Sequence, residues 1–124
     1  MGLKTRNVNS SPLGEDHWKS TWGEISTSEV RCIKFIRESH GVEECWTYPH
    51  ETLVRWVLKK SEPEEIKIIA GGDIVTIRGY GLERLMEGLD LRSLKIVRHH
   101  PVRFSAMLKS SVRIIGIDIE SFSS

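Results

Sequence analysis

Basic side chains between residues 91 and 113 offer the clearest chemistry in this chain. Residues 91–117 contain six basic and no acidic side chains, although the 124-residue chain has a formal net charge of only +1. Cations without acidic neighbours can follow a phosphate backbone, so this segment predicts nucleic-acid binding. The candidate binding residues are Arg92, Lys95, Arg98, His99, His100 and Arg103.

The same segment also fits an ordinary solvated surface. A dedicated nucleic-acid-binding domain is strongly basic overall, whereas this chain is nearly neutral. Base stacking needs aromatic side chains, and Phe104 is the only one in the segment. Acidic residues from elsewhere in the chain can neutralise the six cations in the folded protein. Nucleic-acid binding is therefore an alternative function and not the leading one.

Histidine and cysteine residues do not form a pattern typical of a metal site. His99 and His100 are adjacent, and neighbouring residues of a strand point to opposite faces, so the pair is poorly placed to bind one ion. Cys32 and Cys45 show no metal-ligand spacing and no Cys-x-x-Cys motif. We therefore expect no bound metal. We expect Cys32 and Cys45 to be free thiols in a reducing, cytoplasmic compartment, and a cross-strand disulfide between them is the alternative.

Motifs for cofactor binding and catalysis are incomplete. Gly79-Tyr80-Gly81 resembles the first half of a dinucleotide-binding turn, but Arg84 stands where the third glycine is required. The sequence contains no Gly-x-Ser-x-Gly, no His-Glu-x-x-His and no Walker-type phosphate loop. We expect no cofactor. A small-molecule enzyme, with a site assembled from distant residues, is the second alternative function.

Composition divides the chain into a tail and one domain. Residues 1–17 have little to bury and are expected to be disordered. Residues 18–121 are expected to form a single α+β domain, and residues 122–124 a short tail. The hydrophobic content of 39% is ordinary for a domain with its own core. No apolar run reaches the ~20 residues of a membrane-spanning helix, so we expect no membrane partner.

Two glycines, Gly71 and Gly72, separate two apolar runs and predict a hairpin with a two-residue turn in which both glycines have positive φ. The turn sets the register of the two strands, and opposed residues share a face of the sheet. One face of this hairpin is apolar and consists of Ile66, Ile68, Ala70, Val75 and Ile77. The other face is mixed and consists of Lys67, Ile69, Ile74, Thr76 and an opposed pair of Glu65 and Arg78.

The loop at 61–63 decides the register of the preceding strand, residues 53–59. A three-residue loop places Val54, Trp56 and Leu58 on the apolar face, whereas a four-residue loop would place basic side chains there. Because a one-residue slip exchanges the two faces, the apolar pattern selects the three-residue loop.

An earlier hairpin is predicted by a second two-residue turn, His40-Gly41, and ends at Pro49 because proline cannot donate to a strand ladder. Its two strands and the three that follow would form a meander of five. The expected opposed pairs are Arg37 with Glu44, Phe35 with Trp46 and Ile33 with Tyr48.

A helix is expected at about 81–90, because apolar residues recur there at helical spacing and would cover the apolar face of the sheet. Short strands at 94–98 and 112–119 follow, the latter with Ile115, Ile117 and Ile119 on one side. The fold class is therefore α+β: an antiparallel β-meander of five or more strands, one amphipathic helix on its apolar face, and one or two further strands. The helix stripe consists of Leu82, Leu85, Met86 and Leu89.

These elements predict an interaction module rather than an enzyme. On the mixed face of the sheet, Val57, Ile69 and Ile74 lie among charged residues. Such residues can form a modest patch for a protein partner or for self-association. The leading prediction is a small non-enzymatic interaction or accessory module that acts through the surface or edge of its sheet.

Overall fold

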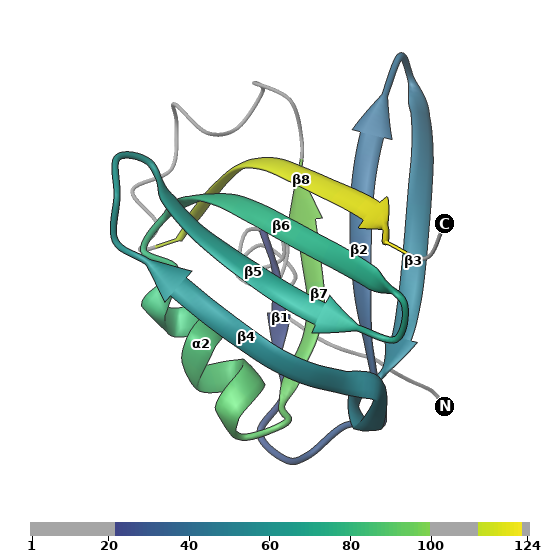
Figure 1. The fold of residues 1–124 in the computed structure, drawn as a ribbon, viewed down its shortest axis with the longest axis vertical. Coiled ribbons are helices and arrows are strands. Elements are labelled where there is room, and N and C mark those ends of the chain that lie inside the picture. The colour runs from purple at the N-terminus through teal and green to yellow at the C-terminus, as the bar shows by residue number, and fades with distance from the viewer. Residues whose placement is uncertain (1–21, 100–111, 123–124) are drawn as a thin grey trace, which may run out of the picture.

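Two four-stranded sheets cross at a steep angle in the computed structural model, which describes residues 22–99 and 112–122 (Figure 1). The first sheet has the strand order β1-β7-β2-β3, and the second sheet has the order β4-β5-β6-β8. The elements are β1 (Gly23–Ile25), β2 (Cys32–Ser39), β3 (Val42–Pro49), the 3-10 helix η1 (His50–Thr52), β4 (Leu53–Lys59), β5 (Glu64–Ala70), β6 (Asp73–Tyr80), the α-helix α2 (Glu83–Asp90), β7 (Leu94–His99) and β8 (Arg113–Ser121).

The α+β class is confirmed, but the expected five-strand meander is divided between the two sheets. Strands β2 and β3 form a hairpin in the first sheet, and β4, β5 and β6 form a meander in the second. Pro49 ends β3 and η1 then redirects the chain, so β3 and β4 do not pair. His50 holds this corner, because its buried ring donates a hydrogen bond from Nε2 to the Leu94 carbonyl oxygen (2.9 Å).

In the first sheet, the predicted register of the β2–β3 hairpin is confirmed for all three expected pairs, including Arg37 opposite Glu44. His40 and Gly41 have φ values of 55° and 78°, as a two-residue turn of this kind requires. Strand β7 lies antiparallel to β1 and parallel to β2, an arrangement that the sequence pattern does not specify.

In the second sheet, the predicted β5–β6 register is confirmed from Ala70 opposite Asp73 to Glu65 opposite Arg78. The expected turn is corrected in one respect: of its two glycines only Gly71 has a positive φ, of 61°. The predicted apolar residues of both strands are fully buried: Ile66, Ile68, Ala70, Val75 and Ile77.

Strand β4 departs from the predicted pattern at its beginning. Trp56 and Leu58 pack against the core as expected, but Val54 is 72% exposed. The register shifts between Leu53 and Arg55, so Leu53 takes the inner position opposite Ala70. The prediction for Val54 was wrong because strict alternation fails where a strand contains an extra residue.

Strand β8 carries a similar correction. Ile117 and Ile119 contact the core, whereas Ile115 is 41% exposed and does not share their face. The β6–β8 register shifts next to Gly79, which leaves Ile115 without an opposed residue. A Cβ atom at Gly79 would lie only 2.0 Å from the Arg113 carbonyl oxygen, so the close approach of β8 requires glycine.

Helix α2 closes the space between the two sheets beside β4 (Figure 1). Its predicted apolar stripe is confirmed, since Leu82, Leu85 and Leu89 are fully buried and Met86 is partly buried against them. The helix and both sheets therefore share one core.

Some predictions concern residues outside the described ones, namely the tails at 1–17 and 123–124.

The cysteines are free, so the alternative of a disulfide between Cys32 and Cys45 was wrong. Helices within residues 22–99 and 112–122 are too short or too polar to cross a membrane.

Candidate binding surface

The outward-pointing face of the second sheet, here called the outer face, carries three rows of residues that each cross all four strands. The registers fix these rows, because opposed residues of neighbouring strands share a face. The first row is Arg55, Ile69, Ile74 and Glu120; the second is Val57, Lys67, Thr76 and Asp118; the third is Lys59, Glu65, Arg78 and Gly116.

The three residues predicted to form a partner surface lie together on this outer face. Val57, Ile69 and Ile74 line an open depression of about 430 Å³ that spans β4, β5 and β6. Val57 is 54% exposed, and the two isoleucines are partly exposed. Charged residues complete the lining of this depression: Arg55, Lys59, Glu65 and Lys67.

Other large exposed apolar residues of the described chain lie on different strands or loops. Each is at a turn, at a strand end, after the helix or at a register shift. The outer face is therefore the place where partly exposed apolar side chains of neighbouring strands meet. The separate residues are Val42, Val54, Leu91, Ile115 and Phe122.

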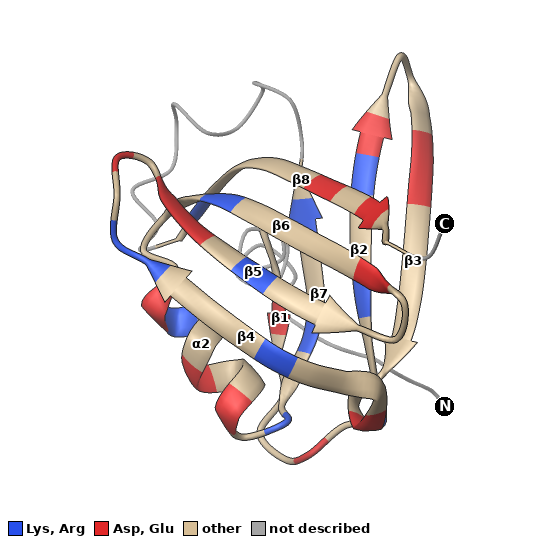
Figure 2. Ribbon diagram, viewed as in Figure 1, with Lys and Arg blue, Asp and Glu red and all other residues tan. Residues whose placement is uncertain are grey.

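Charge is divided between the two edges of the outer face. Arg55 and Lys59 lie on β4 at one edge, and Asp118 and Glu120 lie on β8 at the opposite edge (Figure 2). In the part of the chain that the structure describes, Arg55, Lys59 and Glu120 form no ion pair. The face thus has an uncompensated basic edge and a partly uncompensated acidic edge.

Glu65 and Arg78 are opposed, as predicted, but no ion pair between them occurs among the described residues. Arg78 pairs with Asp118 on the next strand, and Glu65 lies 4.0 Å from Lys67. An arginine in a central strand can reach carboxylates on either neighbouring strand, so the register alone does not decide its ionic partner.

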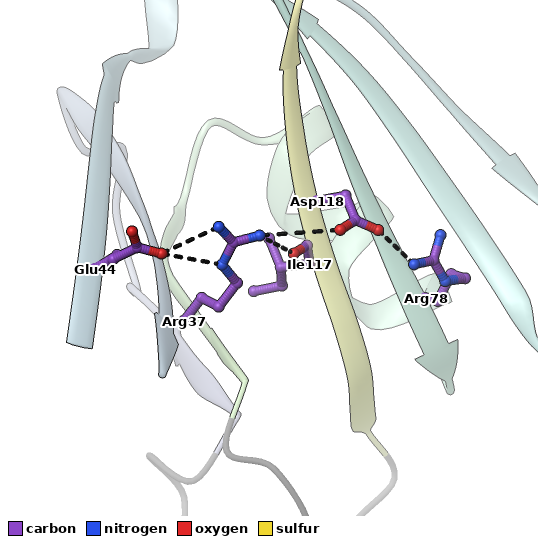
Figure 3. Close-up of polar contacts among 5 residues, drawn as sticks. All are labelled: Arg37, Glu44, Arg78, Ile117 and Asp118. Carbon is purple, nitrogen blue, oxygen red and sulfur yellow. Dashed lines mark hydrogen bonds and ion pairs between the residues drawn. The ribbon is translucent and has the colours of Figure 1, made fainter. Parts of the chain in front are cut away.

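A chain of alternating charges links the two sheets at the β8 edge (Figure 3). The Arg37 guanidinium on β2 donates to Glu44 (3.0 Å) and to the Ile117 carbonyl oxygen (3.0 Å), and it lies 3.9 Å from Asp118. Asp118 in turn pairs with Arg78. Two cations therefore neutralise Asp118, and the first sheet is attached to β8.

Tyr48 forms a second contact between the sheets. Its hydroxyl donates a hydrogen bond of 2.6 Å to the Asp73 carboxylate, and its ring meets Phe35 edge-on with centroids 5.9 Å apart. Burial, the hydrogen bond and the negative charge of Asp73 raise the pKa of Tyr48 well above its ordinary value of 10.0. Tyr48 therefore stays a neutral hydrogen-bond donor, which suits a structural role.

Both edges of the second sheet are protected against the addition of another strand. The β4 edge is irregular at its beginning, because the register shifts at Val54. At the β8 edge, Arg37 occupies the Ile117 carbonyl oxygen. Irregular or occupied edges disfavour strand pairing, so the outer face is the more accessible part of this sheet.

The described part of the basic segment does not form one continuous strip. Arg92 lies in the turn after α2 with a φ of 57°, and Lys95 on β7 pairs with Glu24 at 3.7 Å. Arg98 and His99 are partly buried at the other end of β7. A carboxylate from β1 thus reduces the charge that nucleic acid would meet here.

Two further predicted nucleic-acid contacts, His100 and Arg103, lie outside the described residues. Arg113, at the end of the basic segment, stacks over the Tyr80 ring at 5.0 Å from its centroid. Nucleic-acid binding through residues 91–113 stays a prediction.

A larger depression, of about 550 Å³, is lined by residues that include Cys32, His50 and Arg92. A cysteine and a histidine can act as nucleophile and base when a hydrogen bond joins them. Here His50 is 4% exposed and its Nε2–H is donated to the Leu94 carbonyl oxygen. No hydrogen bond between Cys32 and His50 occurs among the described residues.

Sequence reasoning did not identify the residues that connect the sheets. One signal was available: Arg37 shares a face with the core residue Phe35, so its guanidinium needs acceptors close to the core. The predicted pair with Glu44 supplied one of them. The contacts with Ile117 and Asp118 depend on how the two sheets cross, which strand patterns do not specify.

No family model, curated protein or solved structure matches this chain. Within residues 22–99 and 112–122, no group of three or more His, Cys, Asp and Glu side chains could hold a metal ion. The function must therefore be argued from the surface of the chain itself.

Proposed function

We propose that this protein is a non-enzymatic interaction module that binds a protein partner through the outer face of its second sheet. The observation that carries the proposal is the depression of about 430 Å³ in which Val57, Ile69 and Ile74 lie together. Arg55 and Lys59 frame it without an ionic partner among the described residues.

The physical argument combines apolar burial with charge. Removing apolar surface from water favours association, and the three side chains supply such surface on adjacent strands. Charges at the border of an interface direct the approach and orientation of a partner. The basic edge of the outer face would therefore select a partner that carries acidic groups at the corresponding position. The free thiols Cys32 and Cys45 support a reducing, cytoplasmic location for this module.

Site-specific photo-crosslinking in living cells tests the proposal. A photoreactive amino acid replaces Val57 in the full-length chain, and a matched variant carries it in place of Val54. The two valines lie on the same strand and are 54% and 72% exposed, but only Val57 lines the depression. A discrete crosslinked protein is expected with the first variant and not with the second.

Either of two results would contradict the proposal. Equal labelling at both positions would show that exposure alone, and not the outer face, determines contact. The absence of labelling at Val57 would show that the face has no partner in the cell.

A further inference from the structure

We propose that the partner of the outer face is a second copy of this chain, packed face to face about a two-fold axis that runs parallel to the strands. This inference rests on the proposed function of the outer face as a binding surface. It comes from the order of charged and apolar side chains along the three rows.

The two-fold axis relates the strands in a simple way. An axis parallel to the strands and midway between β5 and β6 places β4 over β8 of the partner, and β5 over β6 of the partner. The first row of one copy then lies over the first row of the partner in reversed order. Arg55 lies over the partner's Glu120, and Ile69 lies over the partner's Ile74. By symmetry, both contacts occur twice.

The third row is only partly complementary under the same rotation. Glu65 faces the partner's Arg78, and Arg78 faces the partner's Glu65. Lys59 lies over the partner's Gly116, and the Arg78 guanidinium of the partner lies beside that glycine, where it pairs with Asp118. This row thus combines two opposite-charge contacts with an approach of Lys59 to the partner's Arg78, whose charge Asp118 already neutralises, and its net attraction is small.

The second row contributes less. Val57 faces the partner's Asp118, whose charge Arg78 and Arg37 already neutralise within each copy. Lys67 faces the partner's Thr76, a pair without charge conflict. The attraction therefore comes mainly from the first row.

A two-fold axis perpendicular to the strands in the same plane gives the opposite result. It places each strand over its own copy, so Arg55 and Lys59 of one chain would approach the same basic edge of the other. Like charges in close contact oppose association, and the outer face has no acidic residue on β4 to relieve them. The charge pattern therefore selects the axis parallel to the strands.

Sheet twist does not remove this complementarity. Packed sheets cross at about 30°, which displaces residues of the edge strands by roughly 4 Å relative to the central ones. The side chains of Arg55 and Glu120 are long enough to bridge this displacement, and Ile69 and Ile74 lie next to the axis where the displacement is small. Four strands spaced ~4.8 Å apart give roughly 500 Å² per copy, about 1,000 Å² in total, which suits a reversible dimer.

Sedimentation equilibrium of the full-length chain at low salt, over a range of concentrations, tests the inference with charge reversals. The variants are Arg55→Glu, Glu120→Arg and the double variant with both changes. Each single reversal creates two repulsive contacts and should weaken dimerisation about tenfold. The double variant should recover most of the loss, because it exchanges the partners of an attractive pair.

Recovery in the double variant cannot come from within one chain. Arg55 and Glu120 are separated by three strand spacings, about 14 Å, and make no contact with each other. Arg84→Glu, the same change on the exposed side of α2, is the matched control and should leave dimerisation unchanged. Circular dichroism of each variant confirms that the fold is retained.

Three results would overturn the inference. If the single charge reversals leave the dimerisation constant unchanged, the dimer uses another surface. If the double variant does not recover dimerisation, the two copies pack in another geometry. A monomer at about 1 mM in low salt shows that the copies do not associate. In that last case the Val57 crosslink separates the two proposals: labelling of a different protein keeps the proposed function, and no labelling removes both.

Discussion

The two faces of the second sheet are built from the same strands and differ in what covers them. On the inner face, Ile66, Ile68 and Ile77 are fully buried beneath the first sheet and α2. On the outer face, Ile69 and Ile74 remain partly exposed, and no described element covers them. Residues one position apart along β5 thus have opposite surroundings.

This difference separates folding from binding. Apolar side chains on the inner face stabilise the fold, because burial there removes them completely from water. The same residue type on the outer face keeps contact with water in the monomer and gains its main stabilisation when a partner covers it. Substitutions on the two faces should therefore affect different measurements.

The largest expected effect comes from Ile68→Ala on the inner face. The free energy of unfolding should fall by about 2–5 kcal/mol, since an isoleucine that is fully buried would leave a cavity. The matched variant Ile69→Ala should cost less than about 1.5 kcal/mol, because its side chain is partly solvated. Both positions lie in the same central strand, so the loss of β-propensity is shared. Urea unfolding of the monomer measures both values.

An equal loss in the two variants would contradict the comparison, because the outer face would then be part of a core. Ile69→Ala should instead act on association. Its effect on the dimerisation constant should exceed its effect on unfolding.

Local patterns were enough to predict much of this fold. The two-residue turns at His40-Gly41 and Gly71-Gly72 fixed both hairpin registers, because a short turn leaves a strand pair only one alignment. The helix stripe and the group of Val57, Ile69 and Ile74 follow from the same periodicities. These features depend on residues that are close in sequence or joined by a known register.

The remaining features depend on geometry that periodicity does not contain. Val54 and Ile115 were assigned to the wrong face because each lies at a register shift. The division into two sheets follows from the turn at η1, which no alternation pattern reports. The unpaired charges of Arg55 and Glu120 could be recognised only once the position of β8 beside β6 was known.

The attachment of the first sheet to the second gives the next largest effect. Arg37→Met should lower the free energy of unfolding by about 1–3 kcal/mol, because the Ile117 carbonyl oxygen loses its donor and Glu44 and Asp118 lose a cation. Thermal or urea unfolding measures this loss. Glu44→Gln is the control and should cost less than about 1 kcal/mol, since it removes only a solvent-exposed partner. A larger loss in Glu44→Gln than in Arg37→Met would show that the contact with β8 contributes little.

The smallest expected effect concerns the contact between Tyr48 and Asp73. Tyr48→Phe should lower the free energy of unfolding by about 0.5–1.5 kcal/mol at neutral pH, since it removes one hydrogen bond between the sheets. The pKa of Tyr48 is raised in the folded protein above its ordinary value of 10.0. Its contribution is therefore complete below that pH and declines as the unfolded chain begins to ionise above it.

Urea unfolding of the parent chain and of Tyr48→Phe, at several pH values on either side of 10.0, tests this sign. The difference between the two proteins should shrink as the pH rises, because only the parent loses stability through this hydroxyl. All other titratable groups are common to both proteins, so their contributions cancel in the difference. A difference that stays constant, or grows, would show that the Asp73 carboxylate does not hold Tyr48 in its neutral form, and the link between the sheets would then rest on Arg37 alone.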